Sequence, residues 1–333
     1  MSRLRLNPLT GRWVTISAER AARPSALASQ ALPVEAEPVD PCPFCPGNEG
    51  ASPPALETYG PARAEGGRAG PSDWQVRVLP NRYPAFSGSD AMVVRHLGPV
   101  VSEASASGRH EVLVLTPEHA ASWADLDGLQ SGLVMAAIRD LVEDHAVTPG
   151  VRYTQAIVNH CRDAGASLDH PHAQFLGIPF VPKELAEEQN AFLRFVGGCL
   201  LCTALEAEVE VGHRSIIEDD LVVAVCPFWS GVPYEVLVMP RAHEGHLDLA
   251  KPADVAAVGR ALANVLARLR SIVGEVAYNV VFHSLPHRSE APYHWHAHVL
   301  PRLTTRAGFE QGTGVLINIV PPEQAAADLR GAA

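Results

Sequence analysis

The sequence repeats itself at a fixed distance of 124 residues. The segment Glu111–His119 matches Glu235–His243, with identical residues at five of nine positions. The last histidine of each segment is followed 51 residues later by another histidine, His170 or His294. A chain that is self-similar in this way folds as repeated units of one design. Each unit is expected to have an α+β fold, with a largely antiparallel sheet and helices on one side. The two sheets can join into one larger sheet.

Two segments with helical spacing of apolar residues, 124–147 and 252–273, also correspond between the halves. The apolar strands that begin at Tyr153 and Tyr278 also correspond. Between the halves, a polar helix is expected from Lys183 to about Phe195. The pattern therefore predicts two domains, an N-terminal catalytic half at 1–182 and a C-terminal degenerate repeat at 183–333.

The composition excludes some classes of function. At 47% hydrophobic and 19% charged residues, the chain is typical of a protein with a packed core. The net charge of −11 argues against a general binder of nucleic acid or of anionic membranes, since both need a basic face. No apolar run approaches the ~20 residues of a membrane span, and the N-terminus does not look like a signal peptide. We therefore expect a cytoplasmic protein.

Four of the six cysteines form two C-x-x-C pairs. Such a pair alone also fits a redox site. Here, however, each pair is accompanied by two histidines, which are 51 residues apart in both halves. This pattern predicts two zinc sites with two cysteine and two histidine ligands each, which saturate the metal and are structural. The predicted ligands are Cys42, Cys45, His119 and His170 in the first half, and Cys199, Cys202, His243 and His294 in the second.

The segment from Asn159 to Gln174 predicts a strand, a loop and a second strand. In an extended chain, the side chains of His170, His172 and Gln174 point to the same face. The small residues from Gly165 to Ser167 leave room for backbone N–H groups to approach an anion. We interpret this segment as a phosphate-handling site with a nucleophilic histidine, in which zinc on His170 fixes the position of His172.

In the second half, the offset places His296 and His298 at the positions of His172 and Gln174. Two interpretations remain open for these histidines. In one, only His294 binds metal, and His296 and His298 are relics of the duplicated segment that contains His172 and Gln174. In the other, His283, His296, His298 and a carboxylate such as Glu188 bind a further metal. The loss of the glutamine predicts that this half does not carry out the same chemistry.

Several longer motifs occur along nearly the whole chain. They are Asn7-Pro-Leu-Thr-Gly-Arg-Trp13, Arg20-Ala-Ala-Arg23-Pro24, Cys42-Pro-Phe-Cys45-Pro-Gly-Asn-Glu49, Asn81-Arg-Tyr-Pro-Ala85, His170-Pro-His-Ala-Gln174 and a tail that begins Gly308-Phe-Glu-Gln-Gly-Thr-Gly314. With these motifs the chain resembles the histidine-triad superfamily, in its branch with galactose-1-phosphate uridylyltransferase.

The resemblance implies a role for each matching residue. The second histidine of the His-Pro-His motif, His172, would be the covalent nucleophile, and Gln174 would contact the transferred phosphoryl group. The substrate-binding residues would be Arg20, Arg23, Asn81, Asn159, Gly165 and Ser167, with the two arginines on the nucleotide phosphates. The resemblance also implies zinc on His170 and a homodimer, in which these arginines reach a neighbouring subunit. In some members, the glutamate that matches Glu188 binds a metal.

The activity implied is transfer of UMP from UDP-glucose to galactose 1-phosphate through a uridylyl-histidine, a step of galactose metabolism. The second cysteine pair and the tail at Gly308 look more like the ADP-sugar phosphorylases, which would use the same histidine. A hydrolase of the same superfamily is a further alternative. An alternative of another class is a zinc-stabilised module that binds nucleotides without catalysis.

Overall fold

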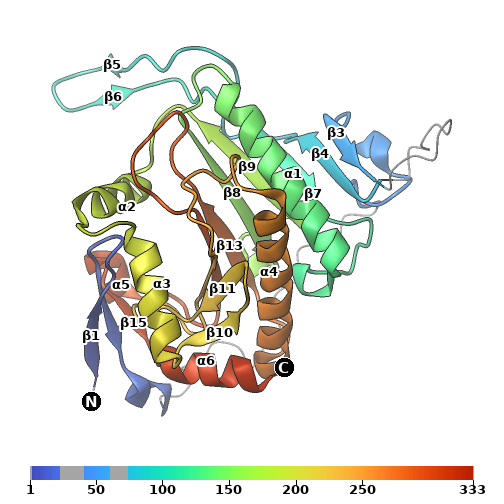
Figure 1. Cartoon of the computed structure of the whole chain (residues 1–333). Coiled ribbons are helices and arrows are strands. Elements are labelled where there is room, and N and C mark those ends of the chain that lie inside the picture. The colour runs from blue at the N-terminus through green and yellow to red at the C-terminus, as the bar shows by residue number, and fades with distance from the viewer. Residues whose placement is uncertain (1, 23–40, 61–73, 333) are drawn as a thin grey trace.

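Ten strands form one antiparallel sheet in the computed structural model, which describes residues 2–22, 41–60 and 74–332 (Figure 1). From one edge to the other they are β10 (Ser215–Glu218), β11 (Val222–Val225), β12 (Val236–Pro240), β14 (His296–Pro301), β13 (Tyr278–His283), β8 (Tyr153–His160), β9 (His172–Ile178), β7 (Arg109–Val114), β4 (Val76–Pro80) and β3 (Glu57–Tyr59).

The sheet has an internal two-fold relation about the pair β8 and β13. These two strands run antiparallel at its centre, with Val158 opposite Val280. Outward from this seam, strands of the first half follow on one side and their counterparts of the second half on the other. The expected α+β duplication is therefore confirmed, and the two predicted sheets have joined into one.

Two long helices, α1 (Gly128–Val147) and α4 (Pro252–Val273), lie side by side over one face of the sheet (Figure 1). Asp127 caps α1 by accepting hydrogen bonds from the first-turn backbone N–H groups, which is why the helix starts later than predicted. The helices approach closely at Gly259, where a Cβ atom would lie 2.6 Å from the Ser131 carbonyl oxygen. Glycine is required there because any side chain would push the helices apart.

The opposite face of the sheet is covered differently in the two halves. In the second half, α2 (Lys183–Arg194) and α3 (Leu200–Val211) contribute Leu185, Phe192 and Leu201 to a core with Val225 and Leu237 of the sheet. In the first half, the cover is the loop around Cys42 and Phe44, which packs on Leu79 and Val112. This smaller cover leaves a cavity on the first half of the sheet.

The remaining elements lie outside the main sheet. The strands are β1 (Arg3–Leu6), β2 (Trp13–Ile16) and β15 (Leu316–Asn318) in a three-stranded sheet, and β5 (Arg95–His96) and β6 (Ser102–Glu103) in a two-stranded arm. The remaining helices are α5 (Gly308–Thr313) and α6 (Pro322–Gly331), with the 3-10 turns η1 (Ala18–Ala22), η2 (Glu49–Ala51), η3 (Trp123–Asp125) and η4 (Arg162–Ala164). No helix of the described residues is long and apolar enough to cross a membrane.

The matched segments of β7 and β12 are not equivalent residue for residue. Val112 pairs with Gln174, whereas Leu237 pairs with His298, so these strands correspond at 125 residues and not at the 124 of the histidines. A shift of one residue moves every side chain to the other face of a sheet. Glu235 accordingly lies 3.4 Å from the ring of His298.

Glu111, its match in the sequence, points to the helix side of the sheet. There the His145 Nε2 lies 2.9 Å from a Glu111 carboxylate oxygen, and the Arg109 guanidinium binds the other oxygen. Burial alone would raise the pKa of Glu111, but these two partners outweigh burial and hold the pKa below its usual value. Glu111 and Glu235 are therefore matched in the sequence repeat but point to opposite faces of the sheet.

Candidate active site and metal centres

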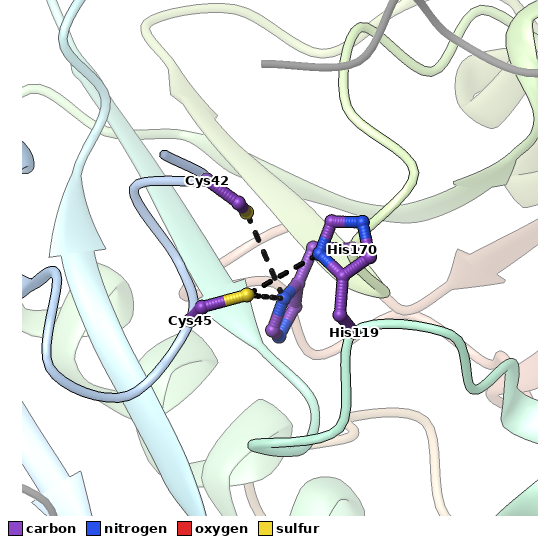
Figure 2. A group of neighbouring side chains, drawn as sticks. All are labelled: Cys42, Cys45, His119 and His170. Carbon is purple, nitrogen blue, oxygen red and sulfur yellow. Dashed lines mark hydrogen bonds between the residues drawn. The ribbon is translucent and has the colours of Figure 1, made fainter. Parts of the chain in front are cut away.

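The structure brings the four residues of the first predicted metal set together (Figure 2). The Sγ atom of Cys45 lies 3.3 Å from the His119 Nδ1 and 3.6 Å from the His170 Nδ1, and the Cys42 Sγ lies 3.9 Å from the His170 Nδ1. Tetrahedral zinc with bonds of ~2.3 Å to sulfur and ~2.0 Å to nitrogen sets these atoms about 3.5 Å apart. The His170 Nε2 donates to the Thr116 carbonyl oxygen at 2.8 Å, which leaves Nδ1 as the ligand atom.

The second predicted set repeats this arrangement. The Sγ of Cys202 lies 3.3 Å from the His294 Nδ1 and 3.6 Å from the His243 Nδ1, and Cys199 completes the group. The His294 Nε2 donates to the Pro240 carbonyl oxygen, at the position 124 residues after Thr116. In each set all four ligand atoms lie within 4.8 Å of one another. Both donor sets therefore fit zinc, and neither leaves a coordination position for a substrate.

The candidate nucleophile, His172, begins β9, two residues after the metal set. Its Nδ1–H donates to the His170 carbonyl oxygen at 2.8 Å, so the lone pair of the neutral ring is on Nε2. Burial lowers the pKa of His172, which keeps the imidazole neutral and nucleophilic at pH 7. The ring of Phe44 packs edge-on against this imidazole at 5.5 Å between ring centroids. The cysteine loop thus contacts both the metal set and the candidate nucleophile.

His172 lines the cavity, which has a volume of about 420 Å³, within the usual range of small-molecule sites. Gln174, Ser167 and Asn81 also line it. Strand pairing explains why, because Gln174 lies opposite Val112, which lies opposite Leu79 on the next strand. Alternate residues of β4, β7 and β9 thus face the same side. Phe44, Leu168 and Tyr83 close the cavity with apolar surface.

Asn159 and Gly165 lie beside the cavity rather than on its wall. Gly165 has a φ of +92°, a left-handed conformation that suits glycine, and a Cβ atom added there would lie 3.7 Å from the Asn159 amide nitrogen. The Asn159 oxygen accepts from the Asn279 amide at 2.8 Å, and the Asn279 oxygen accepts from the Arg302 Nε at 2.7 Å. Because arginine can only donate, this chain of contacts fixes the Asn159 oxygen toward Asn279 and turns its NH₂ the other way.

Of the two arginines of the N-terminal motif, the structure describes only Arg20, and it does not bring this residue to the cavity. Arg20 lies in η1 and is exposed, and it is not among the residues that line the cavity. Arg23 lies outside the described residues. Their predicted contact with phosphate therefore stays a prediction.

In the second half, a group of Glu188, His283, His296 and His298 stands where the first half has Asn159, His172 and Gln174. Their ligand atoms lie within 4.8 Å of one another. The Glu188 carboxylate accepts from the His283 Nδ1 at 3.0 Å. Burial would raise the pKa of Glu188, but His283, Tyr293 and His296 lower it to about 2. The group could therefore hold a metal ion, as the second of the two interpretations expects.

Sequence reasoning missed two residues that support the site, His110 and Asn279. His110 donates from Nε2 to the Gln174 oxygen at 3.1 Å, and Asn279 holds Asn159. The only signal for His110 was its place on the strand, two residues before Val112 on the same face. Asn279 gave no signal, because its contact with Asn159 depends on the pairing of β8 with β13.

Comparison with known proteins identifies two families with matching models. A model of the galactose-1-phosphate uridyl transferase N-terminal domain matches residues 1–182. A model described as a domain of unknown function matches residues 130–330.

Relatives cover nearly the full chain. An ADP-glucose phosphorylase of Arabidopsis thaliana is 30% identical, with 98% of this chain and 92% of that protein covered. A galactose-1-phosphate uridylyltransferase of Thermotoga maritima is 29% identical, with 99% and 98% covered. Among solved structures, the Arabidopsis thaliana ADP-glucose phosphorylase with bound ADP-glucose superimposes with a TM-score of 0.82 at 28% identity, over 99% of both chains. A uridylyltransferase structure gives a TM-score of 0.74 at 27% identity, over 100% of this chain and 98% of that one.

Proposed function

The chain belongs to the galactose-1-phosphate uridyl transferase family, and on that premise we propose that it transfers a nucleotidyl group from a nucleotide sugar through a covalent bond to His172. The observation that supports this proposal is the neutral imidazole on the cavity wall, with Nδ1–H bound to a carbonyl group and Nε2 available. An amide-rich cavity with one such nitrogen suits attack on phosphorus.

The proposed reaction has two displacements. The Nε2 lone pair forms a bond to the α-phosphorus of the nucleotide sugar while the bond from that phosphorus to the bridging oxygen breaks. The sugar 1-phosphate leaves with that oxygen and its electron pair. A phosphate oxygen of the acceptor then attacks the same phosphorus, the P–N bond breaks, and the electron pair returns to Nε2. The carbonyl of His170 accepts the Nδ1–H throughout and holds the ring in place.

Negative charge on the non-bridging oxygens is the charge that the site has to stabilise. The Gln174 amide and the Ser167 hydroxyl lie on the cavity wall and supply donors. The Asn159 NH₂ and the backbone near Gly165 supply further donors beside it. Removing one such donor from a preorganised site typically slows a reaction by about 10²–10³.

Zinc belongs to the proposal as a structural element. Cys42, Cys45, His119 and His170 would hold one ion, and Cys199, Cys202, His243 and His294 the other. When bound, zinc would fix the loops that carry its ligands. Residues 1–182 would then carry the catalytic row, and residues 183–333 would support it as a degenerate repeat. Assembly as a homodimer, with Arg20 and Arg23 reaching a second active site, stays a prediction.

Two nucleotide sugars are candidates for the donor. The motifs around His172 favour UDP-glucose with galactose 1-phosphate as the acceptor. The Arabidopsis thaliana ADP-glucose phosphorylase, with the higher TM-score of 0.82, favours ADP-glucose with inorganic phosphate as the acceptor. The two candidates share the first displacement and differ in the base and the acceptor.

Intact-protein mass spectrometry after brief mixing with UDP-glucose or ADP-glucose tests the proposal. We expect an added mass that equals one nucleotidyl group, and that mass identifies the base. Peptide mapping should place it on His172, and a His172→Ala variant should gain no mass. A His296→Ala variant, which changes the counterpart histidine, should still be labelled once circular dichroism shows that it is folded. Wild-type protein that gains no mass from either donor would contradict the proposal.

A further inference from the structure

His110 lies on β7 beside the catalytic row but is not part of it. The residue faces the cavity side of the sheet, as do Val112 and Val114, because alternate side chains of a strand share a face. It pairs with Leu176, which makes Gln174 its diagonal neighbour on β9. Its imidazole can therefore reach the Gln174 amide without entering the cavity itself.

The backbone determines which nitrogen of His110 carries the proton. The Ala85 N–H donates to the His110 Nδ1 at 3.0 Å, so in the neutral ring the proton is on Nε2. Two side chains lie near that Nε2–H, the Gln174 oxygen at 3.1 Å and the Asn81 amide nitrogen at 3.0 Å. Only Gln174 offers an acceptor, because the Asn81 oxygen already accepts from the Tyr83 N–H at 2.8 Å.

This contact decides how the Gln174 amide is turned. With its oxygen held by His110, the amide presents its NH₂ to the cavity, and among the described residues that NH₂ has no acceptor. A turn of 180° about the last side-chain bond would instead present the oxygen, which repels the oxygens of a phosphoryl group. The isolated amide has no strong preference between the two orientations.

We propose that His110 is a positioning residue, which keeps the Gln174 amide turned with its NH₂ toward the phosphoryl group that His172 receives. The inference rests on the proposed function, because it assigns Gln174 to the transferred group. His110 acts through Gln174 and touches neither the substrate nor the nucleophile. The relay runs from the Ala85 N–H through the imidazole to the amide oxygen.

The second half has a pair at the same place in the sheet. Glu235 is the structural counterpart of His110, and His298 is that of Gln174, with 3.4 Å between the carboxylate oxygen and the His298 Nδ1. A carboxylate can only accept, so this pair has the reverse polarity of the pair in the first half. Both halves therefore place a polar side chain at this position of the neighbouring strand, beside Gln174 or His298.

Two substitutions at one position separate orientation from packing. In His110→Phe the ring volume stays and the donor is lost. In His110→Gln the side-chain amide nitrogen can take the place of Nε2 and donate again. The rate of nucleotidyl transfer to His172 is measured by rapid quench with the donor that labels wild-type protein, at saturating and subsaturating concentrations. Thermal melts of each variant monitor the fold.

Losing such a donor outright slows a reaction by a factor of about 10²–10³. An amide that spends part of its time in the wrong orientation should therefore slow nucleotidyl transfer by a smaller factor, about 10-fold. We expect His110→Phe to slow the saturated rate by that factor with little change in the half-saturating concentration, and His110→Gln to recover most of it. The double variant His110→Phe with Gln174→Ala should be no slower than Gln174→Ala alone, since His110 acts only through Gln174.

Three results would overturn the inference. One is an unchanged rate in His110→Phe while wild-type protein labels normally, which leaves the proposed function intact. Another is a full additional loss in the double variant, which means that His110 acts by another route. The third is absence of labelling in wild-type protein, in which case the proposed function and this inference fail together.

Discussion

Removing one zinc ligand from each half should separate the two metal sets by function. Cys45→Ala and Cys202→Ala change the same position of the two C-x-x-C pairs, and both cysteines are partly buried. Each variant should lose one zinc ion and some thermal stability. Only the first should slow nucleotidyl transfer, because its loop carries Phe44, which packs on His172.

The expected size of the effect follows from that contact. An edge-on aromatic pair such as Phe44 with His172 contributes about 0.5–1.5 kcal/mol beyond area burial. If the freed loop no longer holds the imidazole in the attacking position, that energy is lost from the transition state. At 1.36 kcal/mol for each tenfold change, the rate of adduct formation should fall about 2- to 13-fold.

The assay combines elemental analysis of zinc, a thermal melt and rapid-quench measurement of the adduct at a temperature where both variants are folded. Cys202→Ala is the matched control, since it loses a metal without freeing Phe44. Equal slowing in both variants would mean that zinc acts through global stability. An unchanged rate in Cys45→Ala, with its zinc lost, would refute the proposed link from the metal set to His172.

Two further perturbations test contacts away from the metal sets. Asn279→Asp keeps an acceptor for Arg302 but replaces the donor to the Asn159 oxygen by another oxygen. The Asn159 side-chain amide should then rotate and direct its NH₂ toward that new oxygen. We expect slower adduct formation and also a lower melting temperature, because the buried Asn279 amide donates to the Ala164 carbonyl oxygen as well; wild-type kinetics would argue against a role for Asn159. For Glu111, the pKa is lower in the folded protein, so the ionised carboxylate adds stability above pH ~4.5, and this is lost as the pH falls through the folded value. Urea unfolding of wild type and Glu111→Gln should therefore differ at pH 7 and converge toward pH 3, and a constant difference would contradict this assignment.

The duplication and the two metal sets could be predicted because they depend on spacing. Cys42 and His170 are far apart in sequence, yet the second half repeats both the C-x-x-C spacing and the 51 residues between the two histidines. The row of His172 and Gln174 could be predicted from the two-residue period of a strand. Family resemblance, not spacing, gave Arg20 its predicted role, and the structure does not bring it to the cavity.

Contacts between strands that are remote in sequence could not be predicted. Glu111 and Glu235 are matched in the sequence repeat, but a shift of one residue in strand pairing turns them to opposite faces of the sheet. The relay to Gln174 needs the pairing of β7 with β9, which places His110 diagonally beside it. In both cases the decisive quantity is strand register, which the spacing of residues along one chain does not specify.

The central position of β8 has a consequence for any attempt to cut the protein in two. Severed from β13, this strand would become an open border with a full row of unpaired amides and carbonyls, and such borders recruit other chains. A first half that is expressed alone should aggregate, or should pair with a second copy of itself along β8. The second half therefore protects β8 of the first half from such association.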